Sequence, residues 1–337
     1  MPLFSGRLLL RDGEVEGWLE AEGGRCVAWG EGKAPRKPDA EGWIVPAPVN
    51  AHTHVWDAAL RGKPGKPADV ASLVGPGGWK HRNLAASSPA ELAKGAQVYV
   101  AEMAQVGVAR FLDFREGGVA GARALRGLEL DVPATILGRP ARNDFQEHEA
   151  EELLAVADGL GLSARRDFSK AADVESWAEA AHEAGKLLAL HVSEAVHEPG
   201  DAVLALEPDF VVHAAQCTVE ELEEFAQAGV AVAVSPRSNA YFGLRTPLPR
   251  LLAAGVRVAV GTDNGMLNDG NLWAELGQLA AWHPKVPVAT LLRLATWNAR
   301  NLADLPTQFP PKPKQGLDAV VVPAVPWAPP RTKPGFA

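Results

Sequence analysis

The sequence has only two cysteines among its 337 residues, so neither a disulfide framework nor a cysteine-based zinc site is available. It lacks any run near the roughly 20 apolar residues of a membrane span. Residues 1–10 lack a basic region followed by a long apolar run, so no signal peptide is expected. The net charge of -8 does not supply the basic face that phosphate binding requires. We therefore expect a cytoplasmic protein without a nucleic-acid or membrane partner.

Residues 46–302 contain a regular alternation of short apolar runs and amphipathic stretches. Helix starts are recognisable within it, such as Ser88 as an N-cap with Pro89 at the first helical position. We expect strands that end near residues 52, 114, 137, 164, 191, 213, 235 and 262, each followed by a helix. Eight such units over this length predict a parallel sheet closed into a (β/α)8 barrel, the TIM-barrel fold.

The two ends of the chain follow a different pattern. Residues 1–45 alternate apolar and polar residues around Gly and Asp, which is typical of short antiparallel strands. A last strand is expected at residues 316–322, before a proline-rich end. We predict that residues 1–45 and 303–337 form a small β domain beside the barrel of residues 46–302. Residues 61–87 are expected to form a long loop, of a length that is usually functional or mobile.

Histidines and an aspartate stand where expected strands end. His52 and His54 are two residues apart, which on a strand places both side chains on the same face. His191 and His213 end the fifth and sixth expected strands, and Asp263 ends the eighth. A polar residue at the end of an apolar run is costly to bury unless something pairs with it. Because the carboxyl ends of the strands carry the chemistry of such barrels, these residues predict a metal site there.

The motifs around these residues resemble those of the amidohydrolase superfamily. Within it they are most similar to the branch that includes cytosine, guanine and S-adenosylhomocysteine deaminases and chlorohydrolases. The matching segments are Val49-Asn50-Ala51-His52-Thr53-His54, Leu60-Arg61-Gly62, His191-Val192-Ser193-Glu194, His213, Ser235-Pro236-Arg237-Ser238-Asn239 and Gly261-Thr262-Asp263. The resemblance extends over the whole chain and agrees with the barrel predicted above.

The resemblance also implies a cofactor, which is one divalent metal ion with a water completing its shell. The implied ligands are His52, His54, His191 and Asp263. Members with two metals use a modified lysine at the end of strand four, whereas this chain has Leu162-Ser163-Ala164-Arg165-Arg166 there. Zinc is the expected metal, and iron also suits imidazole ligands.

Three residues have implied catalytic roles. Glu194 would carry a proton from water to the leaving nitrogen, and Asp263 would share that proton traffic. His213 would form a hydrogen bond with the water or with the incoming substrate atom. A metal site with an open position lowers the pKa of its water to about 7, so attack on substrate is feasible at neutral pH.

Arginines near strand ends form a second pattern. Arginine binds planar anions in bidentate fashion, so the pattern suggests an acidic group on the substrate. Asp113 and Arg115 share one face of the second strand and are expected to point into the barrel mouth. Alternatively, the arginines pair with carboxylates such as Asp113, Glu116 and Asp167 and hold the barrel top together. The expected substrate-binding residues are Arg115, His81, Arg165, Arg237 and Asn239.

Together these features predict a metal-dependent hydrolase that deaminates a purine-, pterin- or pyrimidine-like small molecule. The first alternative is hydrolysis of an amide, cyclic amide or carbon–halogen bond by the same residues, because the fold does not fix the bond attacked. A scaffold that retains metal is the non-enzymatic alternative. The sequence leaves the oligomeric state open, including a homo-oligomer.

Overall fold

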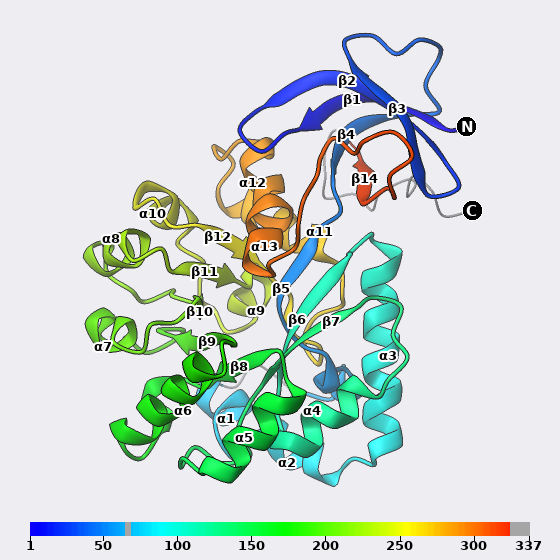
Figure 1. Cartoon of the computed structure of the whole chain (residues 1–337). Helices are drawn as coiled ribbons and strands as arrows, with labels where there is room; N and C mark the ends of the chain where they lie inside the picture. Colours follow the sequence, from blue (N-terminus) through cyan, green and yellow to red (C-terminus); the bar gives the residue numbers. More distant parts are fainter. Residues whose placement is uncertain (65–68, 324–337) are drawn as a thin grey trace.

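The computed structural model of the protein, which describes residues 1–64 and 69–323, contains a barrel of parallel strands and a smaller sheet. Figure 1 shows the small sheet beyond one end of the barrel, with the helices arranged around the outside of the barrel strands. The barrel strands are apolar throughout much of their length. All four residues of Ala231–Val234 are buried, for example, because a parallel sheet covered by helices is shielded on both faces.

The barrel sheet has the order β12-β11-β10-β9-β8-β7-β6-β5-β13. Its strands are β5 (Val49–His54), β6 (Arg110–Arg115), β7 (Ala134–Gly138), β8 (Gly159–Leu162), β9 (Leu187–Val192), β10 (Phe210–His213), β11 (Ala231–Val234), β12 (Val258–Val260) and β13 (Asp263–Asn264). β13 continues the direction of β12 and pairs in parallel with β5, where Asp263 lies opposite Thr53. This pairing joins the last strand to the first and closes the barrel. The (β/α)8 fold predicted from the sequence is confirmed.

Helices connect the barrel strands and cover the sheet. They are η1 (Val55–Leu60), α1 (Val70–Val74), α2 (Trp79–Ala86), α3 (Pro89–Gln105), α4 (Gly118–Arg126), α5 (Glu147–Val156), η2 (Arg165–Asp167), α6 (Ala171–Glu183), α7 (Gly200–Leu204), α8 (Val219–Gln227), α9 (Pro236–Tyr241), α10 (Leu248–Ala253), α11 (Leu272–Trp282), α12 (Val288–Ala295) and α13 (Trp297–Leu302). None of them, within the described part of the chain, combines the length and hydropathy needed to cross a membrane.

The prediction of a long loop at residues 61–87 is wrong, because α1 and α2 lie within this segment. Asp69 caps α1 by accepting a hydrogen bond of 2.9 Å from the backbone N–H of Ser72. Both helices are short, and four successive residues of α2, Lys80 to Asn83, are polar. A sequence with little apolar periodicity between Gly and Pro residues does not indicate a helix, which explains the error.

The last barrel elements also differ from the prediction. The eighth strand is interrupted at Gly261 and Thr262 and is therefore divided into β12 and β13. The segment of residues 288–302, which follows α11, is divided into α12 and α13. Thr296, between them, has φ -112° and ψ -95°, which lies outside the helical region.

The small sheet has the order β14-β4-β1-β2-β3. Its strands are β1 (Leu3–Leu9), β2 (Glu14–Glu22), β3 (Arg25–Glu31), β4 (Ala40–Pro46) and β14 (Ala319–Val322). β14 pairs antiparallel with β4, so the predicted β sheet built from both ends of the chain is confirmed. The proline-rich end that the sequence assigns to the same domain lies outside the described residues after position 323.

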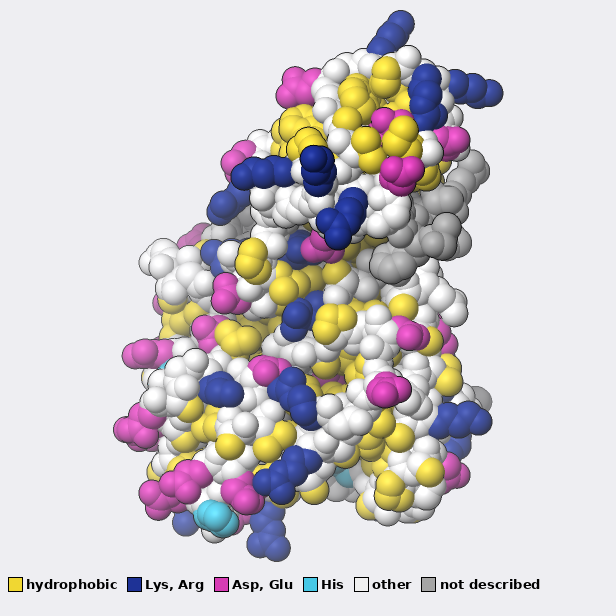
Figure 2. All heavy atoms as spheres, turned by 45° about the vertical axis from the view of Figure 1, so that its right-hand side comes forward, with side chains coloured by type: hydrophobic (Ala, Val, Ile, Leu, Met, Phe, Trp, Pro, Cys, Tyr) yellow, Lys and Arg dark blue, Asp and Glu magenta, His cyan; other side chains and the backbone are white. Residues whose placement is uncertain are grey.

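The barrel interior is filled by apolar side chains below the strand ends. These residues are Val49, Ala51, Leu112, Phe114, Leu137, Ala189, Phe210, Val212, Ala231, Ala233 and Ala259. The Phe114 ring is the uppermost of them, with its centroid 4.4 Å from that of His52 and 6.0 Å from that of Phe210. The functional residues thus lie on an apolar floor from which water is excluded. On the surface, Figure 2 shows Lys and Arg side chains interspersed with Asp and Glu over the face in view.

Gly261 provides a test of how closely the barrel is closed. A Cβ at this position would lie 2.4 Å from the backbone nitrogen and 2.6 Å from the backbone oxygen of His52. We predict that Gly261→Ala lowers the free energy of unfolding by about 1–3 kcal/mol, the usual cost of overpacking, as measured by chemical denaturation. Gly13→Ala is the matched control, because a Cβ there meets no atom within 4 Å. Equal stability of the two variants would contradict the close contact between β5 and the strand break.

Candidate metal centre and active site

The carboxyl ends of the barrel strands bring four histidines and an aspartate together. His52 and His54 lie on β5, His191 on β9, His213 at the end of β10 and Asp263 on β13. Their side chains form overlapping groups in which the ligand atoms lie within 4.8 Å of one another. The groups are His52, His191 and His213; His52, His54 and Asp263; and Glu194, His213 and Asp263. The structure thus brings together every metal ligand implied by the sequence.

The spacing of these atoms fits a single metal ion. Nε2 of His52 lies 3.1 Å from Oδ1 of Asp263, and Nε2 of His54 lies 3.5 Å from the same oxygen. Two metal bonds of about 2.0–2.2 Å at a tetrahedral angle place their ligand atoms roughly 3.3–3.5 Å apart. The rings of His52 and His191 also approach, with centroids 5.0 Å apart. Both nitrogen and oxygen donors are available at one point.

The protonation states of His52, His191 and Asp263 suit metal binding as well. His54 differs, because burial acts to lower its pKa but the Glu116 carboxylate raises it above the ordinary value. Burial lowers the pKa of His52 to about 3 and that of His191 well below its usual range. Burial acts to raise the pKa of Asp263, but the neighbouring imidazoles, led by the hydrogen-bonded His52, hold it well below the ordinary value. Neutral imidazoles and an ionised carboxylate are the forms that bind metals. The donor set therefore fits a divalent cation.

The backbone is strained where two of these side chains originate. His213 has φ 75° and Asp263 has φ 58°, both in the left-handed region that non-glycine residues rarely adopt. Ser193, directly before Glu194, has φ 48°. Such conformations persist only where the surrounding structure imposes them, and they are common at functional sites. The strain turns these side chains towards the common centre, away from the usual strand alternation.

Neighbouring groups orient two of the ligands from behind. The Nδ1–H of His191 donates to the backbone carbonyl of Leu162 at 2.9 Å, which leaves Nε2 free to face the centre. The Ser238 hydroxyl, on α9, donates to Oδ2 of Asp263 at 2.5 Å. Ser238 belongs to one of the matching motifs, but nothing in the sequence indicates what its hydroxyl contacts.

Glu194 lies at the rim of this group, just beyond β9. Its carboxylate oxygen Oε2 is 3.7 Å from Nε2 of His213. Burial raises the pKa of Glu194 above its ordinary value, although the nearby His213 opposes the shift. A buried carboxyl group whose pKa is raised can both accept and donate a proton near neutrality. The position suits a group that moves protons beside the candidate metal.

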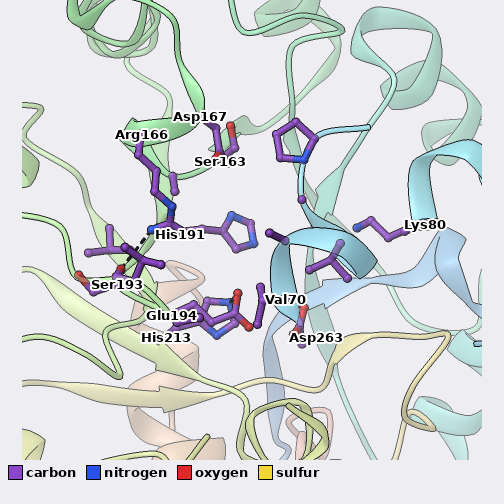
Figure 3. A pocket seen from close by; sticks show the side chains of 18 of the residues that line it. Val70, Lys80, Ser163, Arg166, Asp167, His191, Ser193, Glu194, His213 and Asp263 are labelled. Atoms are coloured by element: carbon purple, nitrogen blue, oxygen red, sulfur yellow. Dashed lines mark hydrogen bonds and ion pairs between the residues drawn. The ribbon is translucent and has the colours of Figure 1, made fainter. Parts of the chain in front are cut away.

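A cavity of about 270 Å³ opens onto the centre. His54, His191, His213, Glu194 and Asp263 form its polar base. Figure 3 shows Arg166, Asp167 and Ser163 along one side of His191, and Lys80 reaching from α2 on the other. The segment with α1 contributes Asp69, Val70, Ala71, Val74, Gly75 and Pro76 to the wall. The volume suits a small, polar ligand.

Arg115 does not line this cavity, so the expectation that it points with Asp113 into the barrel mouth is wrong. Leu112 and Phe114 occupy the inner face of β6, and strand alternation turns Arg115 towards the helices. Its guanidinium lies 4.2 Å from the centroid of the Trp56 ring, and its Nε donates to the carbonyl of Gly121 at 3.1 Å. These contacts agree with the alternative that Arg115 has a structural role.

Asp113 likewise points away from the cavity. Its Oδ1 accepts hydrogen bonds from the backbone N–H of Val55 at 2.8 Å and from the hydroxyl of Thr53 at 2.9 Å. It therefore fixes the chain just beyond the histidine pair of β5.

The other expected substrate residues are also outside the cavity lining. Arg237 pairs with Glu275 at 2.6 Å and with Asp269 at 2.7 Å, and so fastens α9 near α11. The amide oxygen of Asn239 accepts from the Thr246 hydroxyl at 2.8 Å. His81 lies on α2, where Nε2 is 3.3 Å from the carbonyl of Val74. Arg165, on η2, is partly exposed.

Two arginines of the strand-end pattern that are not among the expected substrate-binding residues, Arg139 and Arg166, do line the cavity. Arg139 directly follows β7, and its Nη1 is 3.6 Å from Oε1 of Glu116. Arg166 Nη1 donates to the carbonyl of Val196 and to Oε2 of Glu198, each at 3.1 Å. Both arginines follow strand ends, which is the same sequence signal that identified the histidines.

Comparison with known proteins agrees with this geometry. Residues 132–307 match the sequence pattern of the Amidohydrolase family. The chain is 36% identical over 277 residues to a protein from Archaeoglobus fulgidus described as a candidate aminohydrolase, covering 82% of this chain and 78% of that protein. It is 30% identical over 302 residues to a 5-methylthioadenosine/S-adenosylhomocysteine deaminase from Thermococcus onnurineus, covering 77% and 69% of the two chains.

Solved structures show the same fold at lower identity. A 5-methylcytosine deaminase from Klebsiella pneumoniae superposes with a TM-score of 0.75 at 15% identity, over 97% of this chain and 92% of that one. An atrazine chlorohydrolase from Arthrobacter aurescens, complexed with zinc, has a TM-score of 0.69 at 20% identity, over 91% and 83%. From its sequence, its fold and its relatives, the chain belongs to the amidohydrolase family and is an enzyme of the deaminase and chlorohydrolase branch.

Proposed function

We propose that this enzyme replaces an amino group on an N-heterocyclic small molecule with oxygen and releases ammonia. The observation that carries the proposal is a set of overlapping ligand groups. His52, His54 and Asp263 form one group, and His52 also belongs to a second group with His191 and His213, while Glu194 lines the cavity beside them. Relatives named as deaminases support this reaction type. The proposed substrate is purine-, pterin- or pyrimidine-like.

The proposed metal ligands are His52, His54, His191 and Asp263, and zinc is the proposed ion, with iron as the alternative. When bound, the metal activates a water molecule for attack and polarises the substrate. A single ion is proposed because β8 is followed by Ser163 and Ala164, neither of which can bridge two metals. A zinc-bound structural relative supports the choice of metal.

The protein's own residues would then transfer protons and orient the substrate. Glu194 accepts the proton that the attacking water loses and delivers it to the leaving nitrogen. Its contact with His213, 3.7 Å away, keeps the two groups on the same side of the cavity. His213 forms a hydrogen bond with the atom that becomes the new carbonyl oxygen or with the attacking water. Asp263, held by Ser238, can take part in the same proton transfer while it binds the metal.

We further propose that the substrate carries an acidic group. Arg139 and Arg166 lie on the cavity wall beside Ser163. Arg166 uses Nη1 for its contacts to Val196 and Glu198, and its other guanidinium nitrogens face no hydrogen-bond acceptor found among residues 1–64 and 69–323. A guanidinium has five N–H donors, so a carboxylate or phosphate can still bind in bidentate fashion.

Hydrolysis of an amide, a cyclic amide or a carbon–halogen bond is the competing reaction. The structural likeness to an atrazine chlorohydrolase keeps this alternative open. Ammonia release from a panel of purines, pterins and pyrimidines, compared with chloride release from halogenated analogues, separates the two. The metal-retaining scaffold has no comparable support, because the relatives are named as enzymes. A cytoplasmic location, a homo-oligomer and the lack of nucleic-acid partners stay predictions from the sequence.

The metal content is the first quantity to measure. We predict one divalent metal per chain, mainly zinc, in protein purified without chelators and measured by elemental analysis. Dialysis against a chelator should abolish turnover, and one equivalent of zinc should restore it. Two metals per chain, both required for activity, would contradict the single-metal proposal.

Replacing Glu194 with Gln tests the proton-transfer role. Gln keeps the size of the side chain but cannot shuttle a proton, so kcat should fall by about 10²- to 10⁴-fold while metal content stays intact. Glu220→Gln is the control, because Glu220 is exposed in the first turn of α8 and does not line the cavity. Activity of Glu194→Gln within about threefold of the unmodified enzyme would remove Glu194 from the mechanism.

The acidic-substrate proposal is tested with Arg139→Met and Arg166→Met. Loss of a charge-assisted hydrogen bond costs about 1.5–3 kcal/mol, so KM for an acidic substrate should rise roughly ten- to a hundredfold. A neutral analogue should be affected much less. Arg115→Met is the control, because Arg115 stacks on Trp56 outside the cavity and should lower the melting temperature without distinguishing the two substrates. Equal losses for both substrates in the cavity variants would end the proposal.

A further inference from the structure

A buried cluster of charges lies between the segment that covers the cavity and the metal centre. We call residues 69–86, which contain α1 and α2, the cap. Lys80 of the cap is only 1% exposed. An ammonium group in such a place is costly unless opposite charges surround it. Its Nζ donates to Oε1 of Glu116 at 2.6 Å and lies 3.2 Å from Oδ2 of Asp57.

Glu116 connects this lysine to a candidate metal ligand. The same oxygen that accepts from Lys80 lies 2.9 Å from Nδ1 of His54, a buried atom that has no hydrogen-bond partner among the described residues, so the approach is an ion-pair contact. A carboxylate that faces Nδ1 of an imidazole favours the tautomer in which Nδ1 carries the proton. Nε2 of His54 is then the nitrogen available to a metal. Nε2 of His54 faces Oδ1 of Asp263, 3.5 Å away. Lys80, Glu116 and His54 therefore form a chain of contacts that ends at the metal centre.

Two carboxylates surround the buried ammonium group in this arrangement. Burial acts to lower the pKa of Lys80, but Asp57 and Glu116 raise it above its ordinary value. Arg139, 3.6 Å from Glu116, is the next cation, and its 14% exposed side chain lines the cavity. Lys80 is thus the closest positive charge to the Glu116 carboxylate.

We propose that Lys80 is a positioning residue for the metal centre, holding Glu116 against His54 and so linking the folded cap to the geometry of a metal ligand. The proposal rests on the metal site of the proposed function. Without Lys80, the Glu116 carboxylate would lie buried near the Asp57 carboxylate, with less positive charge to compensate it. It would turn towards Arg139 and leave Nδ1 of His54 without its partner. The ligand would then lose both its tautomer preference and its orientation.

Few apolar contacts hold the cap on the barrel. The buried apolar contacts of the cap form a small cluster, in which Leu73 packs against Leu60 and Met266. α2 contributes to the same cluster through the partly buried side chains of Trp79 and Leu84. The ion pairs of Lys80 add to these contacts between α2 and the barrel. α2 therefore both packs against the barrel and supplies Lys80, which contacts the carboxylate facing His54.

The test is the zinc affinity of Lys80→Met, measured by competition with a chromogenic chelator and independent of any substrate. Loss of a group that orients a metal ligand typically weakens metal binding by about 10- to 100-fold. Lys94→Met, an exposed lysine on α3, is the matched control and should bind zinc as the unmodified protein does. Glu116→Gln should weaken binding in the same way, and the double variant should lose no more than the stronger single change. The visible spectrum of the cobalt-substituted protein should shift in the two single variants.

The outcomes separate this proposal from the function itself. If the unmodified protein binds no zinc, the proposed function fails and this inference fails with it. If the unmodified protein binds zinc and both Lys80→Met and Glu116→Gln bind it equally well, only the positioning role is overturned. A selective rise in KM for acidic substrates, with zinc affinity unchanged, would instead identify Lys80 as a substrate-binding residue and also overturn the proposal. Should Lys80→Met fail to fold, as judged by circular dichroism, Glu116→Gln alone decides.

Discussion

The pairing of β13 with β5 is the contact on which the site depends. It places Asp263 opposite Thr53, between the two histidines of β5, although more than two hundred residues separate them in the chain. Without this closure, the first and last barrel strands would lie at opposite edges of an open sheet. The close approach of Gly261 to the backbone of His52 shows how little space the closure leaves. Ligands from both ends of the barrel sequence meet only because the sheet is closed.

Order at the centre also depends on contacts behind the ligands. His191 is held by the carbonyl of Leu162 on the neighbouring strand, and Asp263 by Ser238 on a helix. His54 faces Glu116, which belongs to the loop after β6. These supports come from three different parts of the fold. A metal ligand held by a partner loses less conformational freedom on binding, so each support raises the affinity of the site.

The barrel and its ligands could be predicted from the sequence because their signals are strong and local. Continuous apolar runs reveal buried parallel strands, and a histidine at the end of such a run is unusual enough to be noticed. The cap could not be predicted, because α1 and α2 are short, half of α2 is polar, and Gly and Pro lie around them. The contact between Lys80 and Glu116 spans 36 positions and leaves no periodic trace in the sequence.

The direction of Arg115 could not be settled from strand alternation alone. Alternation divides β6 into two faces but does not say which face meets the barrel interior. The prediction assumes that the polar face of β6 points into the barrel, where the reaction would take place. Instead, Leu112 and Phe114 occupy the inner face and fill the core. The period of a strand therefore fixes relative directions, and only the packing of the whole barrel fixes the absolute one.

The same fold separates the reacting centre from the parts that would select a substrate. The proposed metal ligands lie on buried strands, while much of the cavity wall comes from the cap and from the segments after β8 and β9. Such walls can change without disturbing the ligands, which explains how relatives with different named substrates share one architecture. In this chain Lys80 departs from that separation, because it belongs to the cap and yet contacts the residue that faces His54. A change in the cap that improves the fit of one substrate would therefore also act on the metal centre, and the two properties could not be varied independently.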